Sequence, residues 1–123
     1  MKDIEIIDQF LDDREFRNYV ARTLPIFGYE NVEIEDVRIA DGTKVNDNDM
    51  IAKKGDFTYT VQTFLNKDIT EKEIKETVRD LHKEHLSFGL IVTNKEVSKD
   101  MKRQAKENGI EIIDREQLKQ LKV

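Results

Sequence analysis

The chain contains no cysteine and only one proline among its 123 residues. The absence of cysteine excludes disulfide bonds, thiolate nucleophiles and sulfur-ligated metal sites, and it suits a reducing compartment. Long apolar runs are also missing, since runs such as Leu90–Val92 are far shorter than the roughly 20 residues of a membrane-spanning helix. The N-terminus, Met1-Lys2-Asp3, lacks a secretory pattern. We therefore expect a cytoplasmic protein with no membrane partner.

Charge dominates what is present. Charged residues make up 38% of the chain and hydrophobic residues 37%, and the mean hydropathy is -0.68. This composition is typical of a soluble globular protein, and the length suits one compact domain. The formal net charge of -5 argues against a dedicated nucleic-acid coat protein, because affinity for phosphate backbones comes mostly from Lys and Arg. A chain with this net charge can still have a locally positive surface that contacts DNA.

The first half of the chain predicts a helix followed by strands. Helical spacing of apolar residues begins at Asp13 and ends near Leu24, because Pro25 disfavours helical geometry before it. Alternating residues at 32–34, continuing loosely to 39, indicate a strand followed by a loop. Residues 50–52 and 57–61 form a hairpin around Gly55. Residues 4–11 fit a helix or a strand equally well.

The second half alternates helices with strands. Thr70 and Glu73 have capping-box spacing and predict the start of a helix. Four further elements follow from apolar runs and caps: a buried strand at 88–92, a helix from Ser98 to Asn108, a strand at 110–113 and a short helix after Asp114. The order predicts an α/β fold, with a mixed sheet of an antiparallel hairpin and parallel strands flanked by helices.

Several short segments occur in a characteristic order: Gly28–Tyr29, Asp49–Ala52, Tyr59–Gln62, Gly89–Asn94 and Gly109–Asp114. In this order they resemble the Mrr-type branch of the PD-(D/E)xK restriction-endonuclease-like superfamily, and the resemblance covers nearly the whole chain. It implies a single restriction endonuclease-like domain over residues 1–123. It also implies metal-dependent hydrolysis of DNA, with Mg²⁺ as the cofactor if the site is active.

The resemblance assigns site residues to the predicted hairpin. Asp49 would anchor the metal, with Gln62 as a second ligand, because Mg²⁺ prefers oxygen donors and activates water for phosphodiester cleavage. Gln62 and position 64 share a face of the strand, since side chains alternate. The family carries lysine at position 64, where this chain has Phe64. Losing such a donor costs on the order of 10²–10³ in rate, so we expect impaired or lost catalysis.

Other features leave alternatives open. Glu15 matches loosely the family's helical glutamate, and Lys67, Lys53 or Lys54 could replace the missing lysine. The candidates for DNA contact are Lys53, Lys54, Thr93, Asn94, Lys99 and Arg103. The basic residues of the helix that begins after Ser98 equally suit a solvated outer face. His82 and His85 could pair on a metal or be structural. A non-catalytic interaction or dimerisation module, forming a homodimer, is the alternative function.

Overall fold

The computed structural model describes Phe10 and residues 12–34, 37–38, 44–46, 50–83 and 88–121. Within these ranges, the side chains of residues 34, 37–38, 44–46 and 82–83 are outside the description. No helix in the described part is long and apolar enough to cross a membrane. The expectations for residues 4–9, Asp49 and His85 lie outside the described residues.

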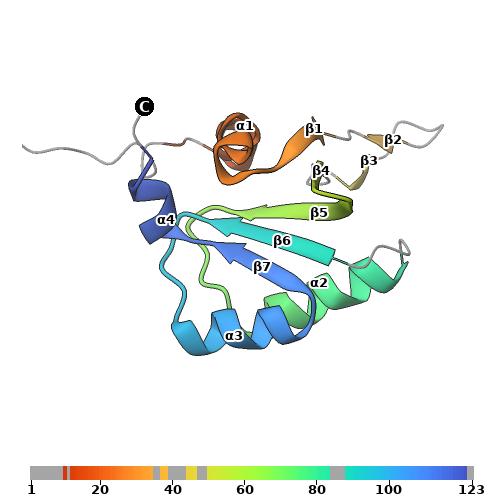
Figure 1. Cartoon of the computed structure of the whole chain (residues 1–123). Coiled ribbons are helices and arrows are strands. Elements are labelled where there is room, and N and C mark those ends of the chain that lie inside the picture. The colour runs from red at the N-terminus through yellow and green to blue at the C-terminus, as the bar shows by residue number, and fades with distance from the viewer. Residues whose placement is uncertain are drawn as a thin grey trace, which may run out of the picture.

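A five-stranded mixed sheet forms the centre of the structure (Figure 1). Its strands lie in the order β1 (Glu30–Ile34), β4 (Met50–Lys54), β5 (Phe57–Phe64), β6 (Phe88–Thr93) and β7 (Ile110–Ile113). The pairs β1–β4 and β4–β5 are antiparallel, whereas β5–β6 and β6–β7 are parallel. The predicted hairpin and the predicted parallel half are therefore both present.

A second, two-stranded sheet differs from the sequence expectation. It pairs β2 (Val37–Arg38) with β3 (Lys44–Asn46) in antiparallel register. The alternation from residue 32 to 39 is thus divided between two sheets, and part of the expected loop is a strand. Short segments such as these have little periodicity, so their pairing depends on a partner strand that the sequence pattern does not identify.

Within the described residues, four α-helices and one 3₁₀-helix surround the sheet. They are α1 (Asp13–Thr23), η2 (Leu24–Phe27), α2 (Glu71–Lys83), α3 (Lys99–Glu107) and α4 (Arg115–Lys119). Side chains of Asp12, Ser98 and Asp114 cap the first turns of α1, α3 and α4, and the sequence predicts helix starts at Ser98 and Asp114. Gly28 has a φ of +94°, which ends η2 and allows the turn into β1.

Alternation along the strands divides the core into two layers. Helix α1 covers one face of the sheet, and α2 and α3 cover the opposite face (Figure 1). Val61 and Leu90 pack with Phe16 and Val20 of α1, in what we call the α1 core, which also contains Leu118 of α4. Ile91 belongs to the other layer, the α2–α3 core, whose members include residues of α2, α3 and β7.

Candidate functional site

Gln62 and Phe64 lie on the sheet face that α2 covers. Gln62 is half-buried, and its amide makes two hydrogen bonds to α2. The Thr77 hydroxyl donates to Gln62 Oε1 at 2.9 Å, and Gln62 Nε2 donates to Asp80 Oδ2 at 3.2 Å. The two positions share a face as the strand period requires. Gln62 is therefore tied to the helix above it.

The Asp80 carboxylate fixes the orientation of the Gln62 amide. An ionised carboxylate only accepts hydrogen bonds, so the NH₂ group of Gln62 faces Asp80 and the carbonyl oxygen faces Thr77. The carbonyl oxygen is the atom that would bind a metal ion. In this structure it lies 2.9 Å from the Thr77 hydroxyl, which is also 2.9 Å from the Glu73 carbonyl, and its second lone pair is not used by that contact. Metal binding by Gln62 therefore stays a prediction.

Phe64 packs in an apolar position beside a lysine. Its half-buried ring lies against the α2–α3 core. The ammonium of Lys67 lies 5.5 Å from the centroid of the Phe64 ring, within the range of a cation–π contact. Lys67 Nζ is also 3.4 Å from Glu73 Oε2. The ring thus packs partly on the α2–α3 core, and the nearby cation belongs to an ion pair.

Glu73, in the first turn of α2, binds both Thr70 and Lys67. Its side chain is buried and accepts hydrogen bonds from the Thr70 backbone N–H at 2.7 Å and from the Thr70 hydroxyl. Burial by itself raises the pKa of the carboxyl. The hydrogen bonds from Thr70, from its own backbone and from Lys67 outweigh burial and lower the pKa to about 2. Glu73 therefore stays ionised and keeps Lys67 as its partner.

The three lysines that could replace the missing one lie in different places. Lys54 Nζ lies 4.9 Å from the centroid of Tyr29, a member of the α1 core, so Lys54 points away from the Gln62 face. Lys53 pairs with Thr58 and shares the Gln62 face, but Thr58 and Gln62 are four positions apart on the strand, a distance of about 13 Å. Lys67 contacts Phe64 and is the nearest of the three to position 64.

Glu15 is not brought to Gln62. Glu15 is exposed on the first turn of α1, where its backbone N–H donates to the Asp12 side chain at 2.9 Å. Helix α1 packs on the opposite face of the sheet from Gln62 (Figure 1). The role of Asp49 stays a prediction, because that residue is outside the described part of the chain. Among the residues that are described, no group of three His, Asp or Glu side chains is arranged to hold a metal.

Thr93 and Asn94, at the end of β6, are buried and bonded to neighbouring segments. Asn94 Oδ1 accepts from the Asn66 backbone N–H at 2.7 Å, and Asn94 Nδ2 donates to Asn66 Oδ1 at 2.8 Å. The Thr93 hydroxyl donates to the carbonyl of Lys67 at 3.4 Å. These bonds fasten the connection between β5 and α2, including Asn66 with its φ of +58°. Asn94 also lines a surface hollow together with Asn66 and Arg115, and contact of Thr93 and Asn94 with DNA stays a prediction.

Lys99 and Arg103 lie on the exposed surface of α3. Arg103 forms an ion pair with Asp100 on the same helix, and the neighbouring Lys102 pairs with Asp114 at 3.1 Å. Acidic partners therefore offset part of the positive charge of α3.

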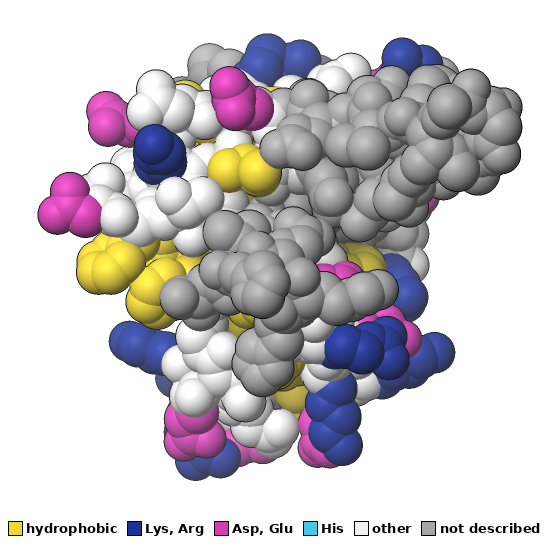
Figure 2. All heavy atoms as spheres, turned by 90° about the vertical axis from the view of Figure 1, so that its right-hand side faces the viewer, with side chains coloured by type: hydrophobic (Ala, Val, Ile, Leu, Met, Phe, Trp, Pro, Cys, Tyr) yellow, Lys and Arg dark blue, Asp and Glu magenta, His cyan; other side chains and the backbone are white. Residues whose placement is uncertain are grey.

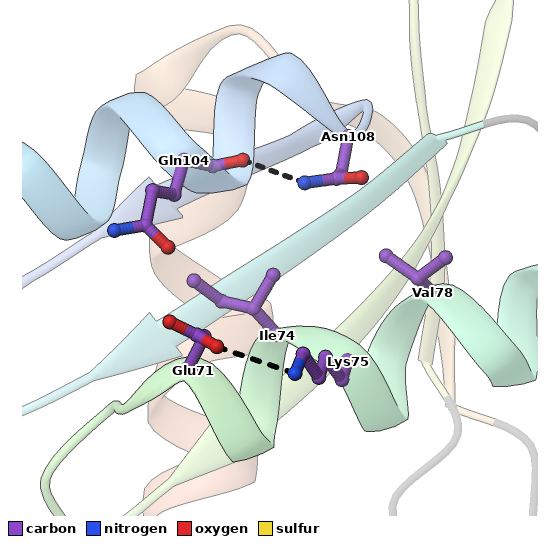
Figure 3. Close-up of a pocket in the computed structure, with 6 residues that line it drawn as sticks. All are labelled: Glu71, Ile74, Lys75, Val78, Gln104 and Asn108. Carbon is purple, nitrogen blue, oxygen red and sulfur yellow. Dashed lines mark hydrogen bonds and ion pairs between the residues drawn. The ribbon is translucent and has the colours of Figure 1, made fainter.

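A hollow of about 370 Å³ lies between α2 and α3 (Figure 3). None of the predicted site residues lines it. Its apolar residues come from α2, and an ion pair between Glu71 and Lys75 lies at one side, with a distance of 3.2 Å. The lining residues are Glu71, Ile74, Lys75, Val78, Gln104 and Asn108.

Sequence inspection missed Thr77, Asp80 and Asn66. The signal that was available is the spacing of Thr77 and Asp80, three residues apart and so on one face of α2. Which strand residue that face meets depends on how the helix packs.

The mixed sheet between α1 on one face and α2 and α3 on the other is the restriction endonuclease-like fold. Residues 9–122 match the Mrr_cat family, described as restriction endonuclease, and the chain belongs to that family. No curated protein sequence gives a significant match.

Two solved structures share the fold. A protein of unknown function, AF1548, is 22% identical with a TM-score of 0.58, and the match covers 80% of this chain and 56% of that one. The DNA modification-dependent restriction endonuclease AspBHI is 13% identical with a TM-score of 0.65, over 93% of this chain and 32% of that one. The chain thus matches about half the length of the first and about a third of the second.

Proposed function

We propose that this chain is a DNA-associated restriction endonuclease-like domain whose phosphodiesterase activity is impaired or lost. The observation that carries the proposal is the phenylalanine at position 64 and its apolar packing. Phe64 packs against the α2–α3 core where the resemblance expects a lysine exposed to the scissile phosphate. An aromatic ring neither orients water nor offsets the negative charge that develops on a phosphate, and both tasks contribute strongly to rate.

The surroundings of position 64 support the same conclusion. Gln62 Oε1 lies 2.9 Å from the Thr77 hydroxyl, so a metal ion would have to use the second lone pair of this oxygen beside α2. Lys67 is the nearest substitute cation, but its ammonium is paired with the ionised Glu73. A lysine engaged in an ion pair is less able to act on a phosphate than a free one. DNA as the partner follows from the restriction endonuclease family.

The test is cleavage of supercoiled plasmid and of branched DNA with Mg²⁺ or Mn²⁺. We would compare wild type with Asp49→Ala, Phe64→Lys and the matched apolar control Phe64→Leu. We expect no cleavage by wild type and by Phe64→Leu. Cleavage by Phe64→Lys that a second substitution, Asp49→Ala, abolishes would identify an intact metal site that lacks only its lysine.

Cleavage by wild type that depends on Asp49 would contradict impaired catalysis. Lys67→Met would then show whether Lys67 is the relocated cation. In that case Lys67→Met should lower the cleavage rate, whereas Lys53→Met, on the same face but distant, should leave it unchanged.

A non-catalytic interaction or dimerisation module is the second candidate. Two observations favour it: the net charge of -5 and the pairing of Arg103 with Asp100 on the helix expected to meet phosphates. Salt-dependent binding to duplex or branched DNA would support the nuclease-derived function, because phosphate contacts release counterions. A mass that rises with concentration, with no affinity for DNA at any salt concentration, would support the interaction module.

A further inference from the structure

Phe57 is an exposed aromatic side chain at the turn between β4 and β5. It keeps 54% of its surface exposed, and Ile26 is the other large hydrophobic side chain exposed in the described part. Figure 2 views the end of the molecule where this turn lies in Figure 1, and it shows hydrophobic side chains at the surface beside charged ones. Leaving a phenylalanine in water forgoes the stabilisation that its burial would give.

A row of aromatic rings supports Phe57 from behind. Its ring centroid lies 5.0 Å from that of Phe88, at an interplanar angle of 75°. Phe88 contacts Tyr59 at 5.5 Å, and Tyr59 contacts Tyr29 at 5.2 Å. Tyr29 and Tyr59 join the α1 core, so the row is anchored in the protein. The exposed ring is therefore held in place before any ligand binds, which lowers the entropy cost of stacking on it.

A lysine lies beside the exposed ring. Lys54 is the cross-strand partner of Phe57, so their Cβ atoms are close neighbours on the same face. Its ammonium lies 4.9 Å from the Tyr29 centroid, so it would have to turn from Tyr29 to a phosphate held beside Phe57. Two acids are on this side of the sheet: Asp56 in the turn, and Glu111, whose charge adds to the effect of burial in raising the pKa of Tyr59. Acidic groups near a single lysine weaken its attraction for an anion, so a ligand held here must gain affinity from the ring as well as from the cation.

Unpaired nucleotides of DNA match this combination. In a duplex each base face is covered by its neighbours, whereas an unpaired base offers a face that stacks on an aromatic side chain. The phosphate next to that base is an anion that one lysine can contact. A protein partner would account for the ring but does not need the lysine.

We propose that the β4–β5 turn binds an unpaired nucleotide of DNA, with Phe57 stacking on the base and Lys54 contacting its phosphate. The inference rests on the proposed function in one respect, that DNA is the partner. It does not depend on whether the chain cleaves DNA. It gives the domain a preference for single-stranded, bulged or branched DNA over a continuous duplex.

The test is fluorescence anisotropy in EDTA with labelled oligonucleotides of one sequence, prepared as a single strand, a duplex and a duplex with one bulged base. Stacking on one base is worth about 1–3 kcal/mol, so Phe57→Ala should weaken binding to the single strand and to the bulge roughly 5- to 150-fold. Duplex binding should change less than twofold. Ile26→Ala, which removes an exposed apolar side chain elsewhere, is the control and should have no effect.

Phe57→Trp gives a direct reading of stacking, because the chain has no other tryptophan. We expect this variant to bind as wild type does, with its emission quenched by the single strand and much less by the duplex. Unchanged emission at saturating single strand would overturn the inference, as would equal affinities for Phe57→Ala and wild type.

DNA binding by wild type shows whether a negative result concerns this inference alone or the proposed function as well. If wild type binds no DNA of any kind, both fail. If it binds DNA in a salt-dependent way that ignores Phe57, only the inference fails. A dimer in the absence of DNA that Phe57→Ala dissociates would assign the ring to a protein interface and would also overturn the inference.

Discussion

Replacing Glu73 with glutamine should make the stability of the protein less dependent on pH. Glu73 is 4% exposed, and it accepts hydrogen bonds from Thr70 and pairs with Lys67 at 3.4 Å. Its pKa is lowered from 4.5 to about 2, with burial opposing the shift and the hydrogen bonds from Thr70 producing most of it. Because these bonds fix the first turn of α2, they also help to position Thr77 above Gln62.

The magnitude follows from the size of this shift. A fall from 4.5 to about 2 at 1.36 kcal/mol per pKa unit corresponds to about 3 kcal/mol of stability that depends on the ionised carboxylate. Since the folded-state pKa is depressed, this stabilisation is fully present above the unfolded value of 4.5. It is lost as the pH falls from 4.5 towards 2. The Lys67 side chain is 53% exposed, so its ion pair contributes less than the Thr70 bonds.

The assay is urea denaturation of wild type and Glu73→Gln at several pH values between 7.5 and 2.5. Glutamine still accepts from Thr70 but lacks the charge, so we expect the variant to lose about 1–3 kcal/mol at pH 7. The difference between the two proteins should shrink as the wild-type carboxylate is protonated. Glu71→Gln is the control, because the exposed pair with Lys75 should contribute less than about 1 kcal/mol.

A difference between wild type and Glu73→Gln that stays constant from pH 7.5 to 2.5 would refute the reasoning. It would mean that the carboxylate charge does not contribute to the folded state. A loss in Glu71→Gln as large as in Glu73→Gln would also refute it, because the two residues would then differ in burial without differing in effect.

Two further substitutions test the packing around the candidate site. A methyl group added to Gly89 would lie 3.2 Å from Thr77 Cγ2 and 3.3 Å from Leu81 Cδ1, so Gly89→Ala should destabilise the protein by about 1–3 kcal/mol. A melting temperature equal to that of wild type would show that α2 moves freely to make room. Asp114 is 2% exposed and accepts from the Val97 N–H at 3.0 Å and from Lys102. Asp114→Asn should cost about 1–3 kcal/mol in urea denaturation, and no change would contradict a structural role for this carboxylate.

Local patterns in the sequence identify most of the helices and strands. Asp12, Ser98 and Asp114 each cap the helix that follows, because a cap depends on residues within one turn. The hairpin around Gly55 forms as the alternation on either side of it indicates. The sequence also shows that position 64 is a phenylalanine and that Gln62 shares its face of the strand. These features depend on near neighbours in the chain.

Tertiary packing alone decides what those two side chains meet. Gln62 bonds to Thr77 and Asp80, which follow it by 15 and 18 residues, because α2 crosses the face of β5. Asn94 bonds to Asn66 across 28 residues. The separation of Glu15 from Gln62 likewise follows from α1 covering the opposite face of the sheet (Figure 1). Contacts of this range depend on how whole helices pack on the sheet, and packing is set by the shapes of two surfaces that no single stretch of sequence contains.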